Sequence, residues 1–472
     1  MPDAIDGSDM LLTPLPQARR ALCCAIVTFA WCFAIWCLYA AIGLELSEKL
    51  ALSATDYGLL LSAPVLTGAL LRFPAGILVE KISPRTLWLW LMLLLIPALL
   101  LLPYAQSLLS LILLGLWLGL AGVAFTLGIA YVSAFYPPAQ QGTIMGLFGV
   151  GNAGAALSLL LVPLLTGMAL PFGIGTGYAL LTVVIFGTFY LFAPLMPGNK
   201  PINSVAASTK AKNTRQSSFW QRSLVLLKDA RLWRFSLYYY FVFGSFLALL
   251  LWLPRYYMQA YQLSAADAMA FTLFFVTTSS MVRALGGWLA DRYGGRAVNW
   301  SVFWICLICL FILSYPPTSL VIHGIEKEVV LEININLWLF TFLIFVIGIA
   351  QGLGRASVFR TIYDYYPDQI GAAGGMVAAI GALGGCTLPL LFGLSQDLLG
   401  IHTACFMLLY GVLAFCMILM FFANQRELYQ RELAAARTHN FLLTDDENSE
   451  QKQPLKSGKQ EHTKVGTDNA NN

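Results

Sequence analysis

Charged residues are scarce in this sequence. Asp, Glu, Lys and Arg make up 11% of its 472 residues, against about 25% in an ordinary soluble domain. Apolar residues make up 58%, and the mean hydropathy is +0.72. This composition excludes a water-soluble globular protein and predicts an integral, multi-pass protein of the inner or plasma membrane. The net charge of +4 is small and spread over loops and tail, so no nucleic-acid partner is expected.

Histidine is also rare, and cysteine is confined to apolar stretches. The four histidines lie in loops, at a helix end or in the tail, and the nine cysteines behave there as small hydrophobic residues. We therefore expect no metal and no cofactor. Acidic residues are missing from the middle of the apolar stretches, since Glu45, Asp56 and Asp267 lie at their ends. With no nucleophile, base or metal set inside the stretches, an enzyme is not expected.

Long apolar runs are what the sequence has in abundance. A bilayer core of about 30 Å needs roughly 20 apolar residues per helix. Twelve runs are long enough, which predicts an all-α polytopic fold with twelve transmembrane helices. They lie near residues 21–45, 57–79, 86–104, 107–135, 142–168, 171–195, 233–256, 266–290, 297–315, 337–360, 371–397 and 401–424.

A polar segment divides these runs six and six. The predicted parts are a cytoplasmic N-terminus (1–20), a six-helix bundle (21–196), a cytoplasmic linker (197–232), a second six-helix bundle (233–424) and a tail (425–472) that begins as helix and is then largely disordered. Short cytoplasmic loops collect Lys and Arg, and their distribution places both termini in the cytoplasm. The loop Pro316–Asn336 is expected outside, with a hairpin suggested by the alternation in Val329–Ile335.

The two halves carry matching sequence. Arg72–Arg85 aligns without gaps on Arg283–Arg296, and Tyr136-Pro137 with its following glycines matches Tyr366-Pro367. Two matches in the same order predict halves related by pseudosymmetry, as in many transporters.

The second copy of the first repeat resembles a known signature. Gly287-Trp-Leu-Ala-Asp-Arg-Tyr-Gly-Gly-Arg296 is similar to the cytoplasmic loop motif of the major facilitator superfamily, and the first copy is a degraded version. The resemblance implies two pseudosymmetric six-helix bundles that move by alternating access. The charged residues of the two loop copies would form a network that holds the halves together on the cytoplasmic side, here called the latch. Its residues are Glu80, Arg85, Asp291, Arg292 and Arg296.

Two glycine-rich runs narrow the resemblance to the nitrate/nitrite porter family. Their glycines are Gly142, Gly146, Gly149, Gly151 and Gly154 in span five, and Gly371, Gly374, Gly375, Gly381 and Gly384 in span eleven. The family implies transport of nitrate, nitrite or both, as nitrate/nitrite exchange or as nitrate/proton symport. We interpret the glycines as smooth faces along which helices slide during the cycle.

Two arginines within spans indicate the binding site. An arginine in a span is costly and marks a functional site by default. Arg72 and Arg283 each lie roughly 12 Å along the helix from the loop acid, at 1.5 Å per residue. Pseudosymmetry makes them face each other across the centre. Two planar guanidinium forks without a nearby carboxylate suit a small oxyanion.

The family resemblance assigns further residues to this site. It implies that Arg72 and Arg283 clamp the anion, that Phe125 and Phe243 sandwich it, and that Tyr239 and Asn152 donate hydrogen bonds. The partners are then a small inorganic anion and the lipid bilayer, and we expect a monomer.

Arg355 departs from the family pattern. It stands where the family is expected to carry Gly-Asn-Gly, and it adds a third cation to the cavity. This leaves open a transporter of the same fold for another small anion, such as a carboxylate or a phosphate ester. A receptor that signals through its tail is a further alternative.

Overall fold

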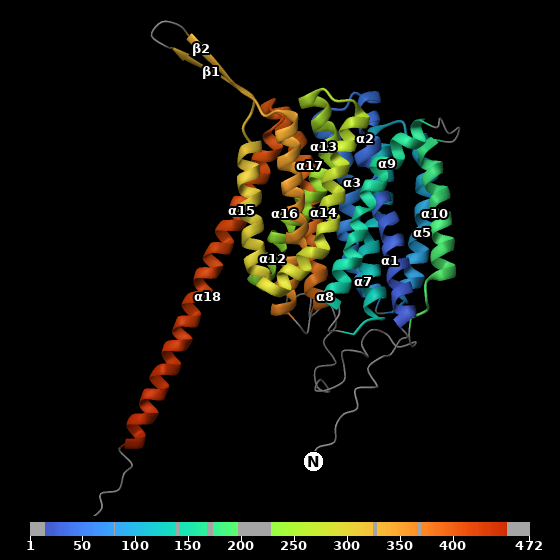
Figure 1. The fold of residues 1–472 in the computed structure, drawn as a ribbon. Coiled ribbons are helices and arrows are strands. Elements are labelled where there is room, and N and C mark those ends of the chain that lie inside the picture. The colour runs from blue at the N-terminus through green and yellow to red at the C-terminus, as the bar shows by residue number, and fades with distance from the viewer. Residues whose placement is uncertain are drawn as a thin grey trace, which may run out of the picture. The chain divides into compact units, whose positions relative to one another are not determined.

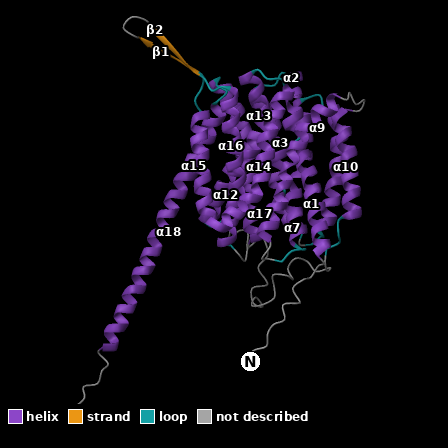
Figure 2. Ribbon diagram, in the orientation of Figure 1, coloured by secondary structure: helices purple, strands orange, loops and turns teal. Residues whose placement is uncertain are grey.

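The structure, a computed structural model, describes residues 15–79, 81–137, 141–167, 173–196, 228–323, 328–366 and 370–450. Within them, twelve helices are long and apolar enough to cross a membrane, and helices dominate the fold (Figures 1 and 2). The predicted number and positions of the spans are confirmed. The chain divides into two compact units, Met1–Met417 and Ile418–Asn472.

The first six spans come from residues before the linker. Their elements are α1 (Leu15–Trp36), α2 (Tyr39–Lys49), α3 (Ala54–Leu70), α4 (Arg72–Leu78), α5 (Pro84–Leu101), η2 (Leu102–Tyr104), α6 (Leu108–Leu118), η3 (Gly119–Val123), α7 (Ala124–Ser133), α8 (Gln141–Phe148), η5 (Gly149–Ala153), α9 (Gly154–Gly167) and α10 (Gly173–Phe192). Several spans are therefore built from two or three consecutive helical segments.

The remaining spans follow the linker. Their elements are α12 (Ala230–Tyr239), η7 (Tyr240–Gly244), α13 (Ser245–Tyr261), α14 (Ala265–Tyr293), α15 (Gly295–Leu313), β1 (Thr318–His323), β2 (Glu328–Ile333), α16 (Leu337–Tyr365), α17 (Ile370–Leu399) and α18 (Ala404–Glu450). The predicted helix at the start of the tail is confirmed by α18. The predicted linker up to residue 227, and residues 451–472, lie outside the described residues.

The repeat extends to the way spans two and eight begin. The side chain of Ser53 accepts a hydrogen bond from the Asp56 backbone N–H at the start of α3, and Ser264 does the same with Asp267 at the start of α14. A serine N-cap satisfies an otherwise unpaired N–H and fixes where the helix starts. The same cap therefore sets the depth of Arg72 and Arg283 in the two spans.

The halves meet along two pairs of spans. Span two packs along span eleven through α3 and α17, and span eight packs against span five through α14, α8, η5 and α9. Gly58 makes one of these approaches possible, because a Cβ there would collide with the backbone of Pro389 and Leu390. The twelve spans form the two pseudosymmetric bundles of the predicted fold.

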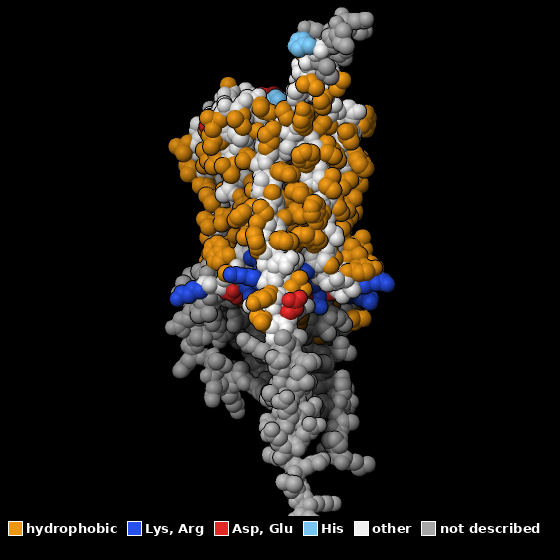
Figure 3. Space-filling model, turned by 90° about the vertical axis from the view of Figure 1, so that its left-hand side faces the viewer, with side chains coloured by type: hydrophobic (Ala, Val, Ile, Leu, Met, Phe, Trp, Pro, Cys, Tyr) orange, Lys and Arg blue, Asp and Glu red, His pale blue; other side chains and the backbone are white. Residues whose placement is uncertain are grey.

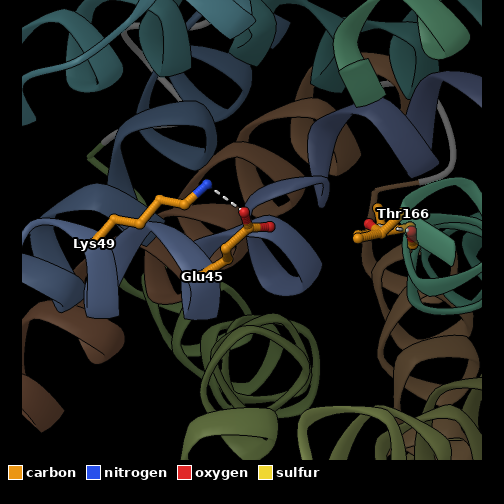
Figure 4. A network of polar contacts seen from close by, with 4 residues as sticks. Glu45, Lys49 and Thr166 are labelled. Atoms are coloured by element: carbon orange, nitrogen blue, oxygen red, sulfur yellow. Dashed lines mark hydrogen bonds and ion pairs between the residues drawn. The ribbon is translucent and has the colours of Figure 1, made fainter. Parts of the chain in front are cut away.

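The two ends of the bundle differ in charge. Large apolar side chains such as Trp90 and Leu109 are exposed between the ends, as expected for surface facing lipid, and Lys and Arg gather near one end (Figure 3). We call this the basic end. The opposite, hairpin end carries β1 and β2, paired antiparallel with Thr318 opposite Ile333, which confirms the predicted hairpin. On α2, Lys49 and Glu45 form an ion pair (Figure 4).

Candidate functional site

Several predicted site residues lie at or beside interruptions of their helices, whereas Arg283 and Arg355 lie within the continuous helices α14 and α16. The first span breaks after Trp36, the second at Leu71, directly before Arg72, and the fourth at η3, directly before α7 and Phe125. Asn152 lies within the 3-10 segment η5, and Phe243 lies within the π-helical segment η7. Short 3-10 and π segments change which carbonyls are free and often occur at functional sites.

Arg72 is held in an aromatic cage. It is buried, and its guanidinium carbon lies 4.9 Å from the Trp36 ring centroid, 5.3 Å from Phe125 and 5.6 Å from Phe243. Its Nε donates to the carbonyl of Gly122 in η3 at 3.2 Å, and its Nη1 donates to the carbonyl of Ala378 in span eleven at 3.2 Å. Arg72 thus connects the two halves.

Trp36 is a member of this cage that the sequence interpretation missed. Its Nε1 donates to the carbonyl of Pro64 at 2.8 Å. A Cβ on Gly122 would lie 2.6 Å from Trp36 Cε2, and a Cβ on Gly68 would collide with Trp36 Nε1. Two glycines therefore make the slot that holds this ring beside Arg72.

Arg283 approaches the same ring from the other half. It is 5% exposed, and its guanidinium carbon lies 5.8 Å from the Phe125 centroid. The guanidinium groups of Arg72 and Arg283 thus lie around the same ring. Arg283 Nε and Nη1 are buried without a hydrogen-bond partner. The convergence of the two arginines, predicted from pseudosymmetry, is found in the structure.

Gly149 provides the space for Arg283. A Cβ at this position would lie 2.6 Å from Arg283 Nε and 2.7 Å from Cζ. The nearby Asn152 is 1% exposed, and neither its amide oxygen nor its amide nitrogen has a partner. Because unsatisfied buried polar groups cost about 1–3 kcal/mol each, these atoms indicate a place for a polar ligand.

Tyr239 and Phe243 form the opposite wall. Their rings stack at 5.2 Å between centroids, and the Phe243 ring centroid lies 5.6 Å from the Arg72 guanidinium carbon. The ring of Tyr239 lies against Gly381, where a Cβ would collide with it. The structure therefore brings Arg72, Arg283, Phe125, Phe243 and Tyr239 into one cluster. Asn152 follows Gly149, the residue that makes room for Arg283, by one 3-10 turn.

The other glycines make close contacts mainly within one half. Gly151 lies against the Phe29 ring and Gly154 against the Ala30 carbonyl, while Gly384 lies against Gly244. Gly374 lies near the Phe359 ring, and a Cβ on Gly146 or Gly375 would meet nothing within 4 Å. Gly142 and Gly371 lie in α8 and α17, but their surroundings are outside the described residues.

Arg355 is buried beside this site. It is 0% exposed, its guanidinium carbon lies 4.0 Å from the Phe246 centroid, and its Nη2 donates to the carbonyl and hydroxyl oxygens of Ser279. Ser279 lies one turn before Arg283 on α14, so the two arginines are held close together. In the described residues the ion pairs join Lys49 with Glu45 and Arg360 with two aspartates, so no carboxylate there pairs with the three buried arginines.

The contacts found for Asp291 and Arg85, two of the predicted latch residues, lie within their own halves. Asp291 lies 2.7 Å from Arg360 Nε, a contact between charges rather than an aligned hydrogen bond, and Arg360 also pairs with Asp364. Arg85 donates to the carbonyls of Tyr190 and Ala193.

Two latch arginines lie over aromatic rings, Arg292 over Trp288 and Arg296 over Tyr365. Glu80 lies outside the described residues. The latch was predicted without Arg360, the partner that Asp291 has here.

The hairpin end is closed by hydrogen bonds between the halves. The carboxylate of Asp397 in span eleven accepts from the backbone N–H of Ala54 at 3.2 Å and of Thr55 at 2.8 Å, the first residues of α3. It also accepts from the Thr55 hydroxyl at 2.6 Å. Asp397 thus caps a helix of the opposite half, where a negative charge is favoured by the helix dipole.

Further contacts between the halves lie at the same end. Arg255 Nη1 donates to the Ser47 hydroxyl at 2.9 Å, and its guanidinium carbon lies 4.6 Å from the Tyr57 centroid. Farther from this end, about two turns into α3, Ser62 donates to the carbonyl of Cys386. Among the described residues, the hydrogen bonds between the halves are those made by Asp397, Arg255, Ser62 and Arg72. The structure is therefore a conformation closed toward the hairpin end.

Comparison with protein families gives one clear match. The model described as Major Facilitator Superfamily matches residues 24–326 and 328–459. A "Probable nitrate/nitrite antiporter NarK1" of Thermus thermophilus is 34% identical over 412 residues, covering 86% of this chain and 91% of the relative. A "Nitrite extrusion protein" of Bacillus subtilis is 27% identical over 359 residues, covering 76% of this chain and 82% of the relative.

Solved structures with the same fold are more distant in sequence. The human organic anion transporter MFSD10 (TETRAN) superposes with a TM-score of 0.64 at 17% identity, covering 86% of this chain and 100% of that one. A bacterial homologue of the human lysosomal transporter Spinster, in an inward-facing and occupied conformation, gives 0.62 at 12% identity, covering 88% and 98%.

Proposed function

This chain belongs to the major facilitator superfamily and, within it, to the nitrate/nitrite porters, and we propose that it exchanges nitrate for nitrite across a membrane. Its relatives are named as nitrate or nitrite transporters, in agreement with a carrier. Each chain contains both halves and the whole site, so we propose that a monomer is the working unit, with both termini in the cytoplasm.

The observation that carries the proposal is the pair of buried arginines that share the Phe125 ring. Arg283 has unpaired N–H groups directed at no protein acceptor. Nitrate and nitrite are small and planar, and their oxygens match the fork of a guanidinium. Phe125 and Phe243 would then hold the plane of the anion, while Tyr239 and Asn152 complete its hydrogen bonds.

The charges favour exchange over net transport. Without an anion, Arg72 and Arg283 repel each other in a place where desolvation already makes each charge costly. An anion removes this repulsion, so the loaded carrier changes conformation more easily than the empty one. Each half-cycle then requires a bound anion, which is the condition for exchange.

The transport cycle requires contacts between the two halves to break at one end and to form at the other. Opening the hairpin end requires loss of the Asp397 cap on α3 and of the Arg255–Ser47 bond. Closing the basic end would bring the latch residues Arg85, Asp291 and their neighbours into contact across the halves. The glycine faces of spans five and eleven would allow the accompanying displacement.

Arginine-to-lysine variants test the site. Arg72→Lys and Arg283→Lys keep the charge but lose the fork, so nitrate uptake into proteoliposomes should fall by more than about tenfold. The matched control is Arg19→Lys, an exposed position on α1. Unchanged uptake in both site variants, with the control also unchanged, would show that the clamp is elsewhere.

A further inference from the structure

Three buried arginines are more positive charge than one monovalent anion can balance. Arg72, Arg283 and Arg355 are each at most 5% exposed, and no carboxylate of the described residues pairs with them. One bound nitrate leaves two uncompensated charges in a region where each is costly.

The three arginines are not equivalent neighbours. Arg283 shares the Phe125 ring with Arg72. It also lies one turn after Ser279 on α14, and Ser279 accepts the hydrogen bonds from Arg355. Arg283 therefore lies between two positions, one toward Arg72 and the other toward Arg355.

Arg355 is fixed on one edge and unpaired on the other. Gly352 lets α16 approach α14, because a Cβ there would lie 2.5 Å from the Ser279 carbonyl oxygen. This approach lets Arg355 Nη2 donate to both oxygens of Ser279, at 2.5 and 2.7 Å. Phe246 covers one face of the guanidinium at 4.0 Å. Arg355 Nε and Nη1 remain buried without a partner, as do Arg283 Nε and Nη1.

From this arrangement we propose a second anion subsite between Arg283 and Arg355, next to the clamp formed by Arg72 and Arg283, so that the carrier holds two small monovalent anions at once. The inference rests on the proposed function, since the ligand is the same class of anion. The unpaired Nε and Nη1 groups of Arg355 donate to the second anion, and the Nη1 group of Arg283, which carries two hydrogens, donates to both anions.

The second subsite gives exchange a physical route. An anion in the Arg283–Arg355 position keeps the charge of the cavity low while the clamp is empty. It can then move toward Arg72 as the outgoing anion leaves, because Arg283 contributes to both positions. A purely structural Arg355, anchored by Ser279 and Phe246, would bind no anion.

The test counts nitrate ions per transporter. Purified protein is titrated with nitrate by calorimetry in gluconate buffer, because chloride would compete for a site of this size. We expect two nitrate ions in the unmodified protein and one in Arg355→Gln. The matched control is Arg360→Gln, on the same helix but paired with Asp291 and Asp364, and it should bind two.

The outcomes separate this inference from the proposed function. One nitrate per unmodified transporter, or two in Arg355→Gln, would overturn the second subsite and leave nitrate transport intact. No nitrate bound to the unmodified protein would overturn the proposed function itself. The count in the unmodified protein decides the matter even if Arg355→Gln does not fold.

Discussion

Replacing Gly149 with alanine should weaken anion binding, because the added methyl group would displace the side chain of Arg283. The new Cβ would lie 2.6 Å from Arg283 Nε, 2.7 Å from Cζ and 3.0 Å from Cδ. Ordinary carbon contacts begin at about 3.4 Å, so the guanidinium has to move by about 0.8 Å. The displaced Nε is one of the donors that has no partner in the protein.

The size of the effect follows from the lost hydrogen bonds. A hydrogen bond to a charged group contributes about 1.5–3 kcal/mol, which corresponds to about 10- to 150-fold in affinity at 1.4 kcal/mol per factor of ten. Folding should be spared, because alanine favours helix over glycine and the crowded atoms belong to a long, flexible side chain.

The assay is nitrate affinity, measured as the rise in unfolding temperature with nitrate concentration. The matched control is Gly146→Ala, one turn earlier in span five, where a Cβ meets nothing within 4 Å. We expect a loss of affinity in Gly149→Ala only. Equal affinity in both variants would refute the placement of Arg283 at the anion.

Three further predictions concern other parts of the molecule. Asp397→Asn should weaken the cap on α3 by about 1 kcal/mol and speed hydrogen exchange there roughly fivefold, whereas Asp267→Asn should leave α3 unchanged. Asn152→Ala should raise the KM for nitrate about two- to tenfold with little loss of stability, because the Asn152 amide has no partner in the protein. The control is Asn299→Ala, which breaks the hydrogen bond from Ser357 and should instead lower the stability by about 1–3 kcal/mol. Burial, and then the positive charge of Arg255, lowers the pKa of His402, so the unfolded chain binds more protons just below pH 6.5. The melting temperature should therefore fall as pH drops through that window, and His402→Gln should reduce this fall; an identical pH profile in the variant would contradict it.

The fold was largely predictable from the sequence. An apolar run of this length that crosses lipid forms a helix, because its backbone N–H and C=O groups must then pair with each other. The twelve spans, the repeat and the hairpin were all found where composition and alternation placed them. What periodicity does not reveal is where a span changes its winding. The segments η3, η5 and η7 are short and, apart from Asn152 and Tyr240, apolar, and their sequences are compatible with continuous helix.

The site was predictable where charge or symmetry marked it. Arg72 and Arg283 were identified because an arginine within a span is energetically costly and marks a functional site. They also occupy equivalent positions in the two copies of the repeat. Trp36 was missed because an aromatic residue in a span is usually packing, and only the slot between Gly68 and Gly122 distinguishes it. Asp397 was missed because its partners are backbone N–H groups of another span, which leave no trace in sequence.

The most direct test of the account is the uptake of labelled nitrate into proteoliposomes, with and without nitrite inside, at equal pH on both sides. If each half-cycle requires an anion bound between the two arginines, uptake should be rapid only when nitrite is present inside. Uptake that is equally fast without internal nitrite, or that requires a pH gradient, would contradict it.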